Sequence, residues 1–116
     1  MEHFLLRQVN SGYKFDLLAA NGEVIATSEV YKTAAACRKG ISSVQKNAPC
    51  APLADLCTGE TCSNPRFEIY EDRSGQYRFR LRSRNGSIIA VSENYTTKRN
   101  CLDGIAAVRR YAGSSR

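Results

Sequence analysis

The sequence contains one histidine, one methionine and no tryptophan among its 116 residues. The single histidine, His3, lies near the N-terminus, which offers no natural catalytic triad, and without a second histidine there is no His-x-x-x-His metal pair. A glycine-rich phosphate loop is also absent. We therefore expect no catalytic residues, no cofactor and no metal. Carboxylates that meet only in the folded chain would still leave an enzyme of unrecognised type as a third alternative.

Long apolar stretches are missing as well. No run approaches the roughly 18 residues needed to cross a bilayer, and the first residues lack the basic end and apolar stretch of a signal peptide. These absences predict a cytoplasmic protein that does not enter a membrane. The number of cysteines, five, is odd, which argues against a complete disulfide framework. Cytoplasmic cysteines normally stay reduced.

Three of the cysteines, Cys50, Cys57 and Cys62, lie within thirteen residues of one another. A structural zinc site usually needs four soft ligands at repeated short spacings, and Cys57-x4-Cys62 reaches only the outer edge of that spacing. Free thiols are favoured over a redox-labile Cys57–Cys62 disulfide, and the disulfide is favoured over a metal site. Cys37 and Cys101 occupy apolar helical positions and are expected to be buried.

The strongest pattern that is present is an internal repeat. Residues 15–48 overlie residues 79–112 at a constant offset of 64, without a gap. Identical pairs include Asn21/Asn85, Gly22/Gly86, Ser28/Ser92, Glu29/Glu93, Tyr31/Tyr95, Cys37/Cys101 and Gly40/Gly104. A repeated unit usually cannot bury its own apolar face. We expect two units that form one compact pseudo-twofold domain around a shared core.

Each unit shows three strand-like runs followed by a helix. Alternating apolar residues predict strands at 4–9, 13–19 and 24–27, and again at 67–70, 77–83 and 88–91. Apolar residues at helical spacing predict helices at 34–46 and 98–110. The fold class is therefore α+β, with an antiparallel sheet and helices packed on it. The predicted organisation is a first β3-α-β repeat at 1–56, a linker at 57–66 and a second β3-α repeat at 67–116.

Two residue types mark the predicted helices. Thr33 and Thr97 are suited to cap the first turns. Gly40 and Gly104 lie mid-helix, where glycine costs roughly 1 kcal/mol against alanine. We interpret both glycines as points where the helix backbone approaches the sheet closely.

Residues 67–108 carry a pattern of three motifs: Phe-x-Ile-Tyr, Ser-Gly-x-Tyr-Arg-Phe-Arg-Leu and Asn-Gly-x-Ile-Ile-Ala-x-Ser-Glu-x-Tyr, the last ending at Tyr95 and followed by Gly-Ile and a valine at 108. This pattern resembles the YegP-like family of small bacterial proteins. Residues 4–56 look like a second copy. The resemblance implies β3-αβ units, in tandem or as a homodimer, that form one sheet by exchanging their post-helix strands. After Ala112 only four residues follow. We therefore expect the second exchanged strand to be missing or rudimentary, with one sheet edge unpaired. The family implies no established activity.

The sharpest surface feature is basic. The net charge is +6, and Arg78, Arg80 and Arg82 alternate along the strand predicted at 77–83, with Arg84 continuing the alternation directly after it. Alternate strand residues share a face, so these four arginines are a candidate surface for an anion or a nucleic acid. The favoured alternative is a solvated face on which they pair with Glu68 or Glu71.

The Ser28-Glu29 and Ser92-Glu93 pairs, with Tyr31 and Tyr95, recur at both strand-to-helix junctions. Paired ligand contacts are one interpretation, and hydrogen bonding of these side chains to nearby backbone groups is the favoured one.

The leading functional hypothesis is a non-enzymatic binding module with an unknown protein partner. Nucleic-acid association is the alternative. The protein is expected to be a monomer with weak dimerisation.

Overall fold

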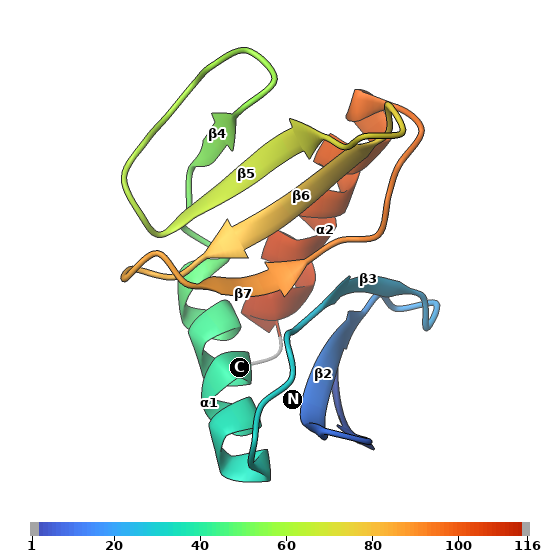
Figure 1. Ribbon diagram of the computed structural model, residues 1–116, viewed down its shortest axis with the longest axis vertical. Coiled ribbons are helices and arrows are strands. Elements are labelled where there is room, and N and C mark those ends of the chain that lie inside the picture. The colour runs from blue at the N-terminus through green and yellow to red at the C-terminus, as the bar shows by residue number, and fades with distance from the viewer. Residues whose placement is uncertain (1–2, 115–116) are drawn as a thin grey trace.

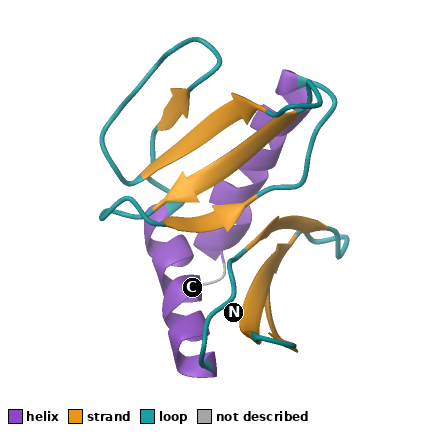
Figure 2. Ribbon diagram, in the orientation of Figure 1, coloured by secondary structure: helices purple, strands orange, loops and turns teal. Residues whose placement is uncertain are grey.

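Apolar residues at alternate positions form strands in both repeats. The computed structural model describes residues 3–114. Its first repeat contains β1 (Phe4–Val9), β2 (Gly12–Leu18), β3 (Val24–Thr27), α1 (Ala34–Asn47) and β4 (Leu53–Asp55). The second contains β5 (Arg66–Glu71), β6 (Tyr77–Arg82), β7 (Ile88–Val91) and α2 (Lys98–Ser114). The expected α+β class is confirmed (Figure 2).

All strands belong to one seven-stranded sheet, in the order β1-β2-β3-β7-β6-β5-β4 (Figure 1). The repeats join at the centre, where Thr27 of β3 faces Val91 of β7. Neighbouring strands are antiparallel except at one edge, where β4 runs parallel to β5. The first repeat therefore contributes its post-helix strand to the second repeat, which is one of the two exchanges that the resemblance implied.

The helices pack against one face of the sheet, and α2 passes behind β5, β6 and β7 in Figure 1. A single core lies between the helices and the sheet. It contains fully buried residues of both repeats, among them Phe15, Leu17, Ile41, Phe79, Leu81 and Ile105. The two helices also contact each other. None of the helices in the described residues is long and apolar enough to span a membrane.

Both helices begin as the sequence predicts. The Thr33 hydroxyl accepts a hydrogen bond from the Ala36 amide at 3.0 Å, and the Thr97 hydroxyl accepts one from the Asn100 amide at 3.1 Å. Each bond satisfies an amide that has no partner within its helix. The mid-helix glycines do make close contacts, but their nearest neighbours are the tyrosines of the strand-to-helix junctions rather than the sheet alone.

Two boundaries differ from expectation. Helix α2 continues past its expected end at Arg110 to Ser114, and buried Ala112 gives that extra turn a contact with the core. Residues 115–116 lie outside the described range. Strand β5 begins at Arg66, inside the expected linker. Within residues 3–114, no strand follows α2 and none lies on the outer side of β1.

Candidate functional site

Glu68 lies at the centre of three arginines on the sheet face that the helices do not cover. Its Oε2 accepts hydrogen bonds from Arg66 Nε at 2.8 Å and Nη2 at 2.5 Å, and its Oε1 accepts from Arg80 Nε at 2.5 Å and Arg82 Nε at 2.9 Å. Arg80 also stacks over the Tyr70 ring. The Glu68 side chain is only 1% exposed. Burial alone would raise its pKa, but the three arginines outweigh burial and lower it to about 2.

The four arginines predicted to share one basic face differ in their ion-pair partners and in their positions in the hairpin. Arg78 forms an ion pair with Asp72 at 3.2 Å, a residue that was not among the two expected partners of these arginines, Glu68 and Glu71. Strand β6 ends at Arg82, so Arg84 lies in the following turn, where it is exposed. The predicted pairing with Glu68 is seen for two of the four. A role for Arg78, Arg80, Arg82 and Arg84 in binding an anion or a nucleic acid stays a prediction.

Sequence reasoning missed Arg66 as a member of this cluster. The residue was placed in the linker, but as the first residue of β5 it shares a face with Glu68 two positions later. A carboxylate with three guanidinium groups leaves the cluster with an excess of two positive charges. One signal could have revealed the cluster: Glu68 lies directly opposite Arg80 in the β5–β6 pair, and Arg66, two residues earlier, lies on the same face of β5.

The serines at the strand-to-helix junctions serve the backbone. The Phe15 amide donates to Ser28 Oγ at 3.0 Å, and Ser28 Oγ donates to the Glu29 carbonyl at 2.7 Å. The same two bonds recur in the second repeat around Ser92, at 2.9 and 2.7 Å. The favoured interpretation, local satisfaction of backbone groups, therefore describes both junctions.

All five cysteines are free thiols. Cys50 and Cys57 are exposed, and Cys62 is half-buried. Cys37 and Cys101 are fully buried, and burial raises the pKa of Cys101 to about 12. Residues 3–114 bring together no group of three histidine, cysteine or acidic side chains that could hold a metal.

The two edges of the sheet provide a more informative comparison. Phe4 of β1 pairs with Leu17, and Phe67 of β5 pairs with Leu81, so β1 and β5 occupy corresponding positions in their repeats. On β5, the Phe67 amide donates to the Pro52 carbonyl at 2.8 Å. The Ile69 carbonyl accepts from the Leu56 amide at 2.9 Å. These outward-facing groups of β5 hold β4 in place.

The corresponding groups of β1 are the amide of Phe4 and the carbonyl of Leu6. Leu5, between them, is 49% exposed. In an antiparallel pair, backbone groups point alternately toward the partner strand and away from it. The inward bond from the Leu18 amide to the His3 carbonyl sets this alternation, so Phe4 and Leu6 point outward. Strand β1 thus presents the same edge that β5 presents to β4.

Side chains of α2 also hold β4 in place. Lys98 forms an ion pair with Asp55, and Arg109 Nη2 donates to the Ala51 carbonyl at 2.8 Å. The corresponding positions of the first repeat, in α1, are Ala34 and Gln45. A strand added to β1 would therefore lack the ion pair and the guanidinium contact that secure β4.

Known proteins match this chain in both of its repeats. A family model described as a domain of unknown function, DUF1508, matches residues 9–55 and 72–115. A UPF0339 protein of Photorhabdus laumondii is 40% identical over 110 residues, which cover 95% of this chain and 85% of that protein. A UPF0339 protein of Methanosarcina acetivorans is 51% identical over 51 residues, covering 44% of this chain and 88% of that protein. That protein is therefore about one repeat long.

Two solved structures share the fold. The solution NMR structure of the Escherichia coli protein yegP, described as a protein of unknown function, is 32% identical and has a TM-score of 0.77, covering 97% of this chain and 86% of that one. A UPF0339 protein of Shewanella oneidensis is 29% identical with a TM-score of 0.78, covering 95% and 83%.

The fold defines an α+β protein in which two similar units share one sheet and one core. By its matches over most of its length, the chain belongs to the YegP-like family of UPF0339 proteins, which contain the DUF1508 domain. These relatives are uncharacterised, and they indicate neither an enzymatic nor a nucleic-acid function.

Proposed function

We propose that this protein is a non-catalytic interaction module that binds an extended segment of a partner protein as an added strand on β1. The observation that carries the proposal is the pairing of β4 with β5, because β1 presents the same outward backbone groups at the opposite edge. Addition of a strand to an exposed sheet edge is a general mode of peptide recognition, in which main-chain hydrogen bonds provide the affinity.

Strand β4 indicates the chemistry of the segment that fits. Leu53 is aligned with Phe67 and packs against the core, and Ala54, aligned with Glu68, is fully buried. At β1 the aligned positions are Phe4 and Leu5. We expect an apolar residue beside Phe4 and a small or apolar residue beside Leu5, in a strand that runs parallel to β1.

We expect the added strand to come from a partner and to bind reversibly, because α1 has no charged residue at either position that secures β4. The ion pair and guanidinium contact that secure β4 have no counterpart in α1. Binding would then depend on main-chain hydrogen bonds and one or two apolar contacts, which favours reversible association. The proposal includes a cytoplasmic setting, supported by five cysteines that are all free.

Hydrogen exchange in the presence of a selected peptide tests the proposal. Peptides displayed on phage would be selected against the purified protein, and the exchange of single amides would be followed by NMR. We expect bound peptides to slow exchange of the outward Leu6 amide, while the Leu5 and Arg7 amides, which point toward β2, are already protected. Ile69 on β5 serves as an internal reference, because β4 already covers it.

A matched pair of variants adds specificity to this test. Leu5→Lys places a charge beside the added strand, whereas Val24→Lys changes a comparably exposed apolar residue on β3, 42% against 49% exposed. Only Leu5→Lys should weaken peptide binding. Peptides that leave Leu6 exchange unchanged and protect another surface would overturn the proposal, as would a stable dimer that already covers Leu6.

A further inference from the structure

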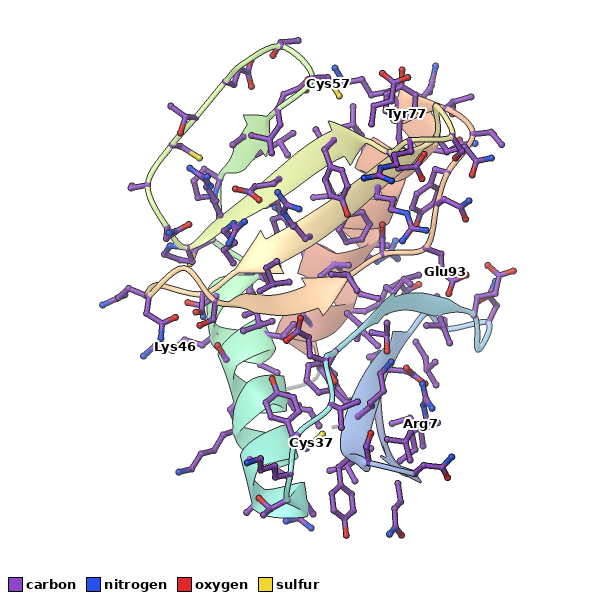
Figure 3. All side chains as sticks on the ribbon, viewed as in Figure 1. Arg7, Cys37, Lys46, Cys57, Tyr77 and Glu93 are labelled. Carbon is purple, nitrogen blue, oxygen red and sulfur yellow. The ribbon has the colours of Figure 1, made fainter. Side chains whose placement is uncertain are left out.

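A pocket of about 440 Å³, lined by polar and charged residues, opens between the end of α1 and the turn that joins β6 to β7. Its lining consists of Ser43, Lys46 and Asn47 from α1 and Ser83, Arg84 and Asn85 from the turn. Figure 3 shows Lys46 at the end of α1 below that turn. This volume lies within the range of pockets that bind small molecules. Two cations therefore reach one pocket from two different elements.

The hydrogen bonds within the lining leave donors available. Asn85 Oδ1 accepts from Ser83 Oγ at 2.5 Å and from the Ser87 amide at 3.2 Å, which leaves the Asn85 amino group as a donor. Asn47 Nδ2 donates to Ser43 Oγ at 3.1 Å, which leaves the Ser43 hydroxyl proton available. Together with the ammonium of Lys46 and the guanidinium of Arg84, these groups form a lining rich in donors.

Among the described residues that line the pocket, no acidic side chain opposes these cations. The six lining residues include no carboxylate, and α1 contains no aspartate or glutamate along its length. The carbonyls at the end of a helix disfavour an anion. Here, however, the Asn47 carbonyl accepts from the amides of Cys50 and Ala51, and the Val44 carbonyl accepts from the Ala48 amide. The turn after α1 thus occupies carbonyl oxygens at the end of the helix with backbone hydrogen bonds.

The first repeat provides an internal comparison. A hollow of about 400 Å³ lies at its corresponding turn, lined by His3, Leu18, Ala19, Ala20 and Gly22. Ala19 and Ala20 are the counterparts of Ser83 and Arg84 in the overlay of the two repeats. A hollow thus borders this turn in both repeats, although its lining in the first repeat includes no residue of α2, and the turn accepts alanine at both positions. The serine and the arginine of the second repeat are not required by the fold.

We infer that the pocket at Lys46 and Arg84 is a binding site for a small organic anion, either a phosphate monoester or a dicarboxylate. The guanidinium and the ammonium contact the anionic oxygens, because charge-assisted hydrogen bonds to such oxygens are the strongest available to these side chains. The Ser43 hydroxyl and the Asn85 amino group contact the remaining polar part of the ligand. This site lies apart from the β1 edge and is independent of strand addition.

NMR titration of the full chain with glycerol 3-phosphate and, separately, with succinate tests the inference. Glycerol serves as the uncharged control. We expect saturable shifts confined to the amides around residues 43–47 and 83–87. Saturation by glycerol 3-phosphate alone assigns a phosphate ligand, and saturation by succinate alone assigns a dicarboxylate. Saturation by neither probe, or shifts that grow linearly and spread over many lysines and arginines, would overturn the inference.

Three single substitutions locate the site. Arg84→Ala introduces the residue found at the corresponding position of the first repeat, and Lys46→Ala removes the second cation. Each should weaken binding about tenfold or more, as expected for loss of a charge-assisted contact. Arg110→Ala is the matched control, because Arg110 is the counterpart of Lys46 in the second repeat and its loss removes the same charge. Equal weakening by Arg110→Ala, or unchanged binding by Arg84→Ala, would reject the site.

Discussion

The hydroxyl of Tyr31 lies against the backbone of Gly40 so closely that a Cβ at residue 40 would fall 2.3 Å from Oη and 2.7 Å from Cζ. The second repeat has the same contact between Tyr95 and Gly104, at 2.4 and 2.9 Å. No real Cβ atom tolerates such distances. A packing requirement therefore explains why both helices contain a glycine that lowers their intrinsic stability by roughly 1 kcal/mol.

Replacing Gly40 by alanine should destabilise the protein, although alanine is the better helix former. The added methyl group must displace the Tyr31 ring, and overpacking of this kind typically costs about 1–3 kcal/mol. Urea unfolding monitored by circular dichroism measures the effect. Gly113→Ala is the control, because a Cβ there would meet Pro49 Cγ at an ordinary 3.5 Å. A higher midpoint for Gly40→Ala than for the parent would contradict the packing requirement.

Glu68→Gln should be among the most destabilising polar substitutions in the chain. It keeps the shape of the side chain but removes the charge that three arginines share, and breaking a buried ion pair costs roughly 3–5 kcal/mol. Because the arginines remain 20–26% exposed, we expect the lower end of that range. Glu71→Gln makes the same chemical change at an exposed position of the same strand and should have little effect.

The same cluster sets a dependence of stability on pH. The pKa of Glu68 falls from its ordinary 4.5 to about 2 in the folded protein. Its stabilising contribution is therefore complete above pH of about 4.5 and is lost as the pH decreases toward 2. Unfolding curves across this window should show a steeper loss of stability for the parent than for Glu68→Gln. If the stability of the two proteins fell in parallel as the pH decreases, the arginines would not be lowering the pKa of Glu68.

Local sequence patterns were sufficient for the elements but not for contacts between them. Alternating apolar residues predict the strands, and Thr33 and Thr97 predict the helix starts, because these signals act within a few residues. The contact of Tyr31 with Gly40 depends on how the chain bends between β3 and α1. The pocket at Lys46 and Arg84 depends on how α1 of one repeat meets a turn of the other. Neither relation is encoded in local periodicity.

The cysteines should separate into distinct classes when the native protein reacts with Ellman's reagent. Exposed Cys50 and Cys57 should react first and half-buried Cys62 more slowly, whereas Cys37 and Cys101 should react only when the protein unfolds. Burial, together with the charge of Asp55, raises the pKa of Cys57, so Asp55→Asn should accelerate its reaction. A fast phase that persists in a Cys50→Ser/Cys57→Ser variant would contradict this assignment.

Thermal unfolding should show one cooperative transition rather than one for each repeat. The core is continuous across residues of both repeats, and β4 of the first repeat is paired with β5 of the second. Neither repeat can lose its structure without exposing apolar surface of the other. Near-ultraviolet and far-ultraviolet circular dichroism should therefore give coincident melting curves. Two separated transitions would show that the repeats are energetically independent.

The protein should be a monomer with a weak, concentration-dependent tendency to dimerise through β1. An open edge can recruit the same edge of another molecule, but charged side chains on edge strands oppose such pairing. Arg7 is the charged residue on this edge: its side chain is 43% exposed, and its guanidinium pairs with Asp16 at 2.9 Å. Light scattering over a roughly hundredfold concentration range should therefore show association only at the upper end.

Hydrogen exchange identifies the surface responsible for this association. Exchange of the outward Leu6 amide should slow as the concentration rises, while Ile69, already covered by β4, should not change. Leu5→Lys adds a second charge to the edge and should suppress association, whereas Val24→Lys should leave it intact. A tight dimer at the lowest concentration, or association that leaves Leu6 exchange unaffected, would mean that the β1 edge is not the surface through which copies of this protein meet.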